Sequence, residues 1–126
     1  MMRPSARILV VDDESDTVDL IRFTLETAGF TVDQALDGTS AIDMITHDEY
    51  DVVLLDIMMP DLSGFDVLQK LQSDSVAPPP VIFLTARQNQ EDIETGRNLG
   101  AAGYLTKPTK RGDLLDAIEA SIQKEN

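Results

Sequence analysis

Short apolar or alternating runs of strand length recur five times along the chain, with segments of helical periodicity after them. The runs are Ile8–Val11, Phe30–Ala35, Val52–Leu55, Val81–Leu84 and Tyr104–Thr106. A run that is apolar at every position, such as Val52–Leu55, is typical of a parallel strand buried on both faces of its sheet. The alternation predicts an α/β fold: a doubly wound, five-stranded parallel sheet with five helices on its two faces.

The segments between the runs carry apolar residues three or four positions apart, as amphipathic helices do. Ser15 is the expected N-cap of the first helix, and the last helix carries Leu115, Ile118 and Ile122 on the face expected to be buried. A length of 126 residues suits one domain. We therefore expect residues 1–126 to form a single domain with a core from about residue 6 to residue 122.

Charge and composition exclude several classes of function. The chain has 10 basic and 23 acidic side chains, and its net charge of -13 disfavours direct contact with nucleic acid or with an anionic membrane. The absence of cysteine excludes disulfides and thiolate chemistry, and the single His47 excludes a site with two histidines. No apolar run approaches the roughly 20 residues of a membrane span, so a cytoplasmic location is expected.

Polar side chains follow four of the predicted strands at the points where those strands end. Asp12 and Asp13 follow the first strand, Asp56 the third, Thr85 the fourth and Lys107 the fifth. The carboxyl ends of parallel strands meet at one edge of the sheet, where ligands of doubly wound proteins bind. We expect these five side chains to converge there.

A cluster of three carboxylates is stable only if some are protonated or a cation lies among them. Oxygen ligands select a hard cation, and Mg²⁺ is the expected ion. A magnesium site with open positions suits a phosphoryl group, which Lys107 and the Thr85 hydroxyl could contact. One of the carboxylates could itself be the nucleophile that forms an aspartyl phosphate.

The motifs at the strand ends resemble those of the receiver domains of two-component response regulators. They are the segment Ile8–Glu14, Asp56 followed by Pro60 and Gly64, the segment Leu84–Ala86, and Lys107–Pro108. Their order and spacing match across the chain from about Ala6 to Ile122. The resemblance implies the flavodoxin-like sheet with strand order 2-1-3-4-5.

The resemblance also implies roles for the acidic residues. Asp56 matches the phosphoacceptor, which takes a phosphoryl group from a histidine kinase. Asp13 matches a direct magnesium ligand, and Asp12 matches a ligand that acts through water. Met58 stands where the family lends a backbone carbonyl to the metal. Lys107 matches the lysine that pairs with the phosphoryl oxygens.

A second set of residues matches the switch and the rate-tuning positions of the family. Thr85 matches the hydroxyl that moves toward the phosphoryl group, and Tyr104 matches the aromatic residue whose ring then turns inward. Lys107–Pro108 is where the family places a cis peptide bond. Met58 and Arg87 occupy the positions beside the site that tune the phosphoryl lifetime. Because Met58 cannot orient a hydrolytic water, we expect slow autodephosphorylation.

The resemblance thus favours a phosphorylation-activated signalling switch, not a conventional enzyme. Its implied partners are a sensor histidine kinase or phosphotransfer protein, and an effector protein or output domain, with a homodimer possible on phosphorylation. A magnesium-dependent phosphohydrolase with an aspartyl nucleophile is the alternative, but such enzymes commonly place an acid two residues after the nucleophile, where Met58 stands. A flavin carrier of the same fold is a third reading, which Asp12, Asp13 and Glu14 oppose because they repel phosphate.

Overall fold

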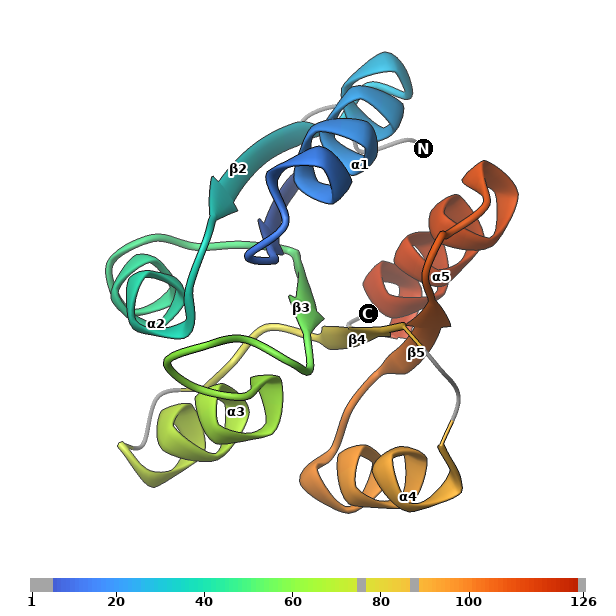
Figure 1. Ribbon diagram of the computed structural model, residues 1–126. Coiled ribbons are helices and arrows are strands. Elements are labelled where there is room, and N and C mark those ends of the chain that lie inside the picture. The colour runs from blue at the N-terminus through green and yellow to red at the C-terminus, as the bar shows by residue number, and fades with distance from the viewer. Residues whose placement is uncertain (1–5, 75–76, 87–88, 125–126) are drawn as a thin grey trace.

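The computed structural model describes residues 6–74, 77–86 and 89–124 and is shown in Figure 1. Its five strands are β1 (Arg7–Val11), β2 (Thr31–Ala35), β3 (Val52–Asp56), β4 (Val81–Thr85) and β5 (Gly103–Thr106). Its helices are α1 (Ser15–Thr27), α2 (Gly38–His47), α3 (Gly64–Ser73), α4 (Gln90–Leu99) and α5 (Arg111–Lys124). Strands and helices alternate along the described chain, as the apolar pattern predicts.

All strand pairs in the sheet are parallel, and the order is β2-β1-β3-β4-β5. The predicted doubly wound, flavodoxin-like α/β fold with this strand order is therefore confirmed. The order reverses between β1 and β3, and these two strands are paired so that Val11 lies opposite Leu55. Asp12 follows Val11 and Asp56 follows Leu55, so this register brings both aspartates to the same edge of the sheet.

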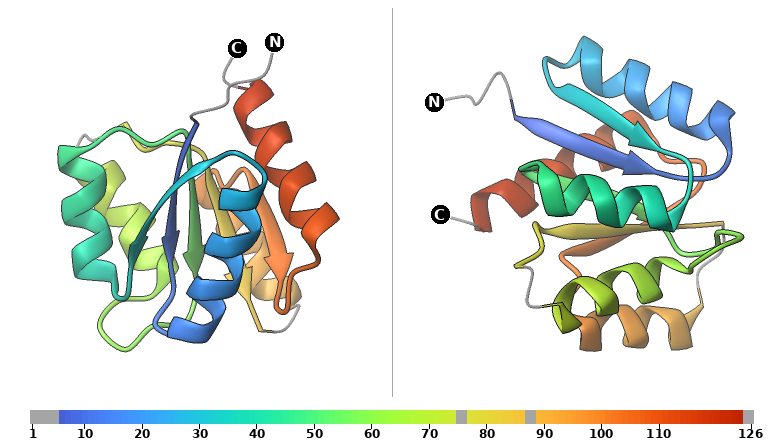
Figure 2. Two further views of the ribbon diagram at one scale, coloured as in Figure 1. Left: turned by 90° about the horizontal axis from the view of Figure 1, so that it is seen from above. Right: turned by 90° about the vertical axis from the view of Figure 1, so that its left-hand side faces the viewer.

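Helices cover both faces of the sheet, with α1 and α5 on one face and α2, α3 and α4 on the other (Figures 1 and 2). Each face has its own apolar core. Ile8, Val10 and Leu54 point toward α1 and α5, whereas Leu9 and Phe83 belong to the cluster under α2, α3 and α4. Every residue of β3 and β4 is buried, because both strands are covered on both sides.

Two details of the helices differ from the prediction. Ser15 is the first residue of α1, and Glu14 is the N-cap, without a side-chain capping bond, so the predicted cap is wrong by one residue. In α5 the most deeply buried apolar residues are Leu114 and Ile118, whereas Leu115 is only half-buried. Ile118 is buried as predicted, and Leu115 and Ile122 pack against the core at the edge of a stripe that also includes Leu114.

Candidate functional site

Four strand ends supply the side chains at the carboxyl edge of the sheet. Asp12 directly follows β1, Asp56 is the last residue of β3, Thr85 is the last residue of β4, and Lys107 directly follows β5. Asp12 is fully buried, while Asp56 and Thr85 are 4% and 6% exposed. The apolar strands thus carry polar groups into positions where solvent screens them poorly, which strengthens the electrostatic interactions among them.

Three carboxylates form a cluster at this edge. One oxygen from each of Asp12, Asp13 and Asp56 lies within 4.8 Å of the other two. Asp13 is exposed, so the cluster opens to solvent on its side. A donor set of carboxylate oxygens with an open side fits a hard divalent cation that keeps some of its water, as Mg²⁺ does. The residues present could therefore hold the metal that the sequence predicts.

Lys107 supplies the positive charge within this site. Its Nζ donates hydrogen bonds to Asp12 Oδ2 at 2.8 Å and to Glu14 Oε1 at 3.1 Å, and lies 3.5 Å from Asp56 Oδ2. The Lys107 backbone N–H also donates to the carbonyl oxygen of Thr85 at 2.7 Å, and the Lys107–Pro108 peptide bond is cis. These contacts tie the β5 end to the β4 end and aim the ammonium group at the carboxylates.

The crowding of charges shifts the proton affinities of Asp56 and Lys107. Burial, together with the negative charge of Asp12, raises the pKa of Asp56 to about 7, although Lys107 and the N–H of Met58 act in the opposite direction. Burial by itself lowers the pKa of Lys107, but its bond to Asp12, the negative charge of Asp56 and its bond to Glu14 outweigh this and raise that pKa above its usual value. Lys107 is thus charged at neutral pH, whereas Asp56 is harder to ionise than an ordinary aspartate.

Met58 is placed beside Asp56 but points outward. Its backbone N–H donates to Asp56 Oδ1 at 3.3 Å, and its side chain is 74% exposed. The thioether therefore stands in solvent at the rim of the site, where a bulky apolar group affects which molecules approach. Arg87, the other predicted rate-tuning residue, lies outside the described residues.

Tyr104 occupies β5 next to the site, and its ring is half-buried between the sheet and α4. The ring packs on Phe83 with a centroid distance of 5.6 Å, and the hydroxyl donates to the carbonyl oxygen of Asp92 in α4. Gly96 faces the ring, because a Cβ atom added there would lie 2.8 Å from two ring carbons. The missing side chain of Gly96 thus leaves the notch in α4 that receives Tyr104.

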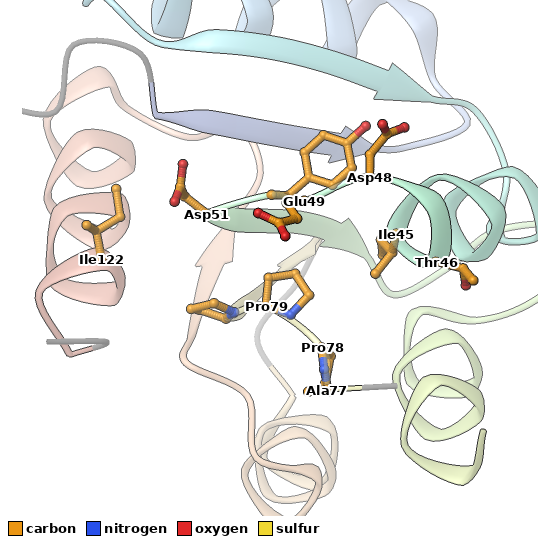
Figure 3. Close-up of a pocket in the computed structure, with 11 residues that line it drawn as sticks. Ile45, Thr46, Asp48, Glu49, Asp51, Ala77, Pro78, Pro79 and Ile122 are labelled. Carbon is orange, nitrogen blue, oxygen red and sulfur yellow. The ribbon is translucent and has the colours of Figure 1, made fainter. Parts of the chain in front are cut away.

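The structure brings together the predicted Asp12, Asp13, Asp56 and Lys107, and it places Thr85 on the neighbouring strand end. Sequence reasoning missed the bond between Glu14 and Lys107, although Glu14 follows the two strand-end acids directly and its position is a signal for it. A separate pocket of about 470 Å³ lies at the opposite end of the sheet (Figure 3). Residues that precede β3 and β4 line it, so this pocket is not part of the carboxylate site.

A parallel sheet in this order, with clustered carboxylates and a lysine at its carboxyl edge, defines a doubly wound α/β protein whose carboxylates could hold a cation. A family model described as the response regulator receiver domain matches residues 8–119. The chain belongs to this family, the receiver domains of two-component response regulators. Among the described residues, none of the helices has the length and apolar character that a membrane crossing needs.

Individual relatives agree with the family. The chain is 38% identical over 120 residues to the regulatory protein VanRc of Enterococcus gallinarum, across 95% of this chain and 51% of that protein. It therefore spans about half the length of this curated relative. A response regulator receiver domain protein from Clostridium thermocellum is similar in structure, with a TM-score of 0.86 and 35% identity over 95% of this chain and 96% of that one. The chemotaxis protein CheY4 of Vibrio cholerae gives a TM-score of 0.85 and 30% identity over 91% and 97% of the two chains.

Proposed function

We propose that the chain is a phosphorylation-activated switch whose phosphoacceptor is Asp56. The observation that carries the proposal is the position of this buried carboxylate, between two further carboxylates and the ammonium group of Lys107. The donor is a phosphohistidine of a sensor kinase or of a phosphotransfer protein. An Asp56 carboxylate oxygen attacks the phosphorus atom, the phosphorus–nitrogen bond breaks, and the imidazole leaves while the new acyl phosphate stays on Asp56.

The residues that would hold Mg²⁺ are Asp13 and Asp56 directly, the backbone carbonyl of Met58, and Asp12 through water. A bound Mg²⁺ supplies positive charge that offsets the repulsion among the carboxylates and the charge of the phosphoryl oxygens. Because the pKa of Asp56 is raised to about 7, nearby positive charge also favours its ionised, nucleophilic form. Lys107 already contributes such charge from 3.5 Å.

Lys107 and Thr85 respond to the phosphoryl group once it is attached. A phosphoryl group carries about two negative charges, which makes it a stronger partner for Lys107 than the single charge of Glu14. The Thr85 hydroxyl moves toward a phosphoryl oxygen, and the ring of Tyr104 turns into the space that Thr85 leaves. The contacts of Tyr104 with Phe83 and α4 support this coupling, since movement of the ring changes the surface formed by α4, β5 and α5.

This proposal makes the chain a signalling module and not a conventional enzyme. It catalyses its own phosphorylation and loses the phosphoryl group slowly, because Met58 offers no polar group to orient water. Met58 also weighs against the phosphohydrolase alternative, because such enzymes commonly have an acid at that position. Residues 1–126 would form one receiver domain in the cytoplasm. Its output would be an effector protein or an output domain, with a homodimer formed on phosphorylation.

Incubation with acetyl phosphate and Mg²⁺, followed by measurement of the intact mass, tests the proposal. We expect one phosphoryl adduct per chain. No adduct should form when a chelator is present during the incubation, and none should form in Asp56→Asn. Asp113→Asn is the matched control. It makes the same substitution at a carboxylate in α5, outside the cluster, and should accept the phosphoryl group as the wild type does. An adduct that persists in Asp56→Asn would exclude Asp56 as the acceptor. Multiple turnover of a phosphate ester would favour the phosphohydrolase.

A further inference from the structure

Asp61 joins the loop that follows β3 to the first turn of α2. Its Oδ1 accepts hydrogen bonds from the backbone N–H groups of Gly38 at 3.0 Å and Leu62 at 2.8 Å. Its Oδ2 accepts from the backbone N–H of Thr39 at 2.9 Å and from the Thr39 hydroxyl at 2.8 Å. Gly38 and Thr39 begin α2, where N–H groups have no partner within the helix. Asp61 thus caps α2 from a distant part of the chain.

The loop also packs closely against the start of α2. A Cβ atom added to Gly38 would lie 2.8 Å from the Cβ of Leu62 and 3.0 Å from Cγ2 of Val67, so only glycine allows this approach without a shift. We call the contact of Asp61 with Gly38 and Thr39 the α2 clasp. Figure 1 shows α2 and α3 side by side on the same face of the sheet, with the loop after β3 leading into α3.

The same loop begins directly after Asp56 and contains Met58. At its start, the N–H of Met58 donates to Asp56 Oδ1, and at its end the N–H of Gly64 donates to the carbonyl oxygen of Ile57 at 2.8 Å. Asp61 lies between these two points. The α2 clasp therefore fixes the middle of a loop whose first residues border the carboxylate cluster.

We propose that the α2 clasp positions the backbone of Met58 for the metal site, which makes Asp61 a positioning residue for phosphoryl transfer. This inference rests on the proposed function, which assigns the Met58 carbonyl to Mg²⁺. Asp61 is not a member of the carboxylate cluster, so it acts on the site through the loop. When the clasp is lost, the loop gains conformational freedom. Binding of the cation must then order the loop, and the entropy cost of that ordering weakens the binding.

A matched control separates this role from simple capping of α2. Asp37 is the N-cap of the same helix and accepts from the Ser40 N–H at 2.8 Å, but it does not bond to the loop. Asp61→Ala and Asp37→Ala therefore each remove a cap of α2, and only Asp61→Ala releases the loop. Gly38→Ala is a second variant that displaces Leu62 without removing a carboxylate.

The first measurement is amide hydrogen exchange of the metal-free protein, in the presence of a chelator. We expect faster exchange at the Met58 and Gly64 amides in Asp61→Ala, whereas Asp37→Ala raises exchange at the start of α2 alone. Unchanged exchange at Met58 in Asp61→Ala would overturn the proposal, whatever the protein does with phosphate. The exchange measurement tests the α2 clasp even if the wild type accepts no phosphoryl group. A wild type that accepts no phosphoryl group would refute the proposed function instead.

The second measurement is the Mg²⁺ affinity of each variant, followed by NMR titration. Loss of a residue that orients a metal ligand weakens binding by about tenfold or more, and we expect a loss of that size in Asp61→Ala. Gly38→Ala should reproduce the loss, Asp61→Asn should fall between Asp61→Ala and the wild type, and Asp37→Ala should stay close to the wild-type value. Equal weakening in Asp61→Ala and Asp37→Ala would reduce Asp61 to a helix cap and contradict the inference.

Discussion

Replacing Gly96 with alanine adds one methyl group to the part of α4 that faces Tyr104. The new carbon would lie 2.8 Å from two carbons of the ring, whereas carbon atoms in contact are about 3.5–4.0 Å apart. The ring must withdraw, and its hydroxyl then loses the carbonyl oxygen of Asp92 and part of the contact with Phe83. The hydrogen bond is worth about 1 kcal/mol and the ring pair about 0.5–1.5 kcal/mol.

Helix propensity acts in the opposite direction, since alanine is favoured over glycine by about 1 kcal/mol in a helix interior. The sum is a net destabilisation of about 0.5–1.5 kcal/mol for Gly96→Ala. Gly112→Ala in α5 is the control, because nothing lies within 4 Å of its added carbon. We expect that variant to be as stable as the wild type or more stable, by up to about 1 kcal/mol.

Urea unfolding monitored by circular dichroism measures both effects, because a change in stability shifts the midpoint urea concentration and leaves the dependence of the unfolding free energy on urea unchanged. A double-mutant cycle sharpens the test: in a Tyr104→Ala background the clash is absent, so Gly96→Ala should stabilise the protein there. If Gly96→Ala stabilises the wild-type background as much as the Tyr104→Ala background, the ring does not occupy the α4 notch, and the reasoning is refuted.

Four further predictions concern the carboxylate site. Because the pKa of Asp56 is raised to about 7 in the folded protein, its protonated form stabilises the fold at low pH, and that contribution is lost as the pH rises through 7. Without metal, the melting temperature of Asp56→Asn relative to that of the wild type should therefore rise from pH 5 to pH 8. A difference in melting temperature that stays constant with pH would contradict this. Lys107→Ala should lower the free energy of unfolding by about 1.5–3 kcal/mol, because it leaves the carboxylates without a cation; urea unfolding measures the loss, and Mg²⁺ should restore part of it. Met58→Asn should shorten the phosphoryl half-life followed by intact mass, and an unchanged half-life would remove Met58 from the rate argument. Thr85→Ala should still accept the phosphoryl group but show no change of Tyr104 signals in NMR spectra, and a normal change would break the proposed coupling.

The fold could be predicted from the sequence because strands that are buried on both faces have a simple, continuously apolar sequence pattern. The central strands are apolar at every position, and each is followed by polar residues at the edge of the sheet. For that reason the sequence alone predicts Asp12, Asp56 and Lys107 at one edge of the sheet. The strand order has no such trace in the apolar pattern, and its prediction depended on the resemblance to receiver domains.

Contacts between side chains on separate loops and helices could not be predicted in the same way. The α2 clasp joins Asp61 to residues 22 and 23 positions earlier, and an exposed acid after a proline gives no signal of its partner. The notch at Gly96 depends on the rotation of α4 against β5, which one glycine in a weakly periodic helix does not specify. The deeper burial of Leu114 than of Leu115 has the same origin, since packing against the sheet sets how α5 is rotated about its axis.

Mapping the phosphoryl group is the most direct test of the central claim. After reaction with acetyl phosphate and Mg²⁺, reduction with borohydride converts an aspartyl phosphate to homoserine, which peptide mass spectrometry locates. We expect homoserine at position 56 in the Mg²⁺-treated sample, and none when the metal is chelated. Homoserine at another position, or the same yield at position 56 with and without the metal, would contradict it.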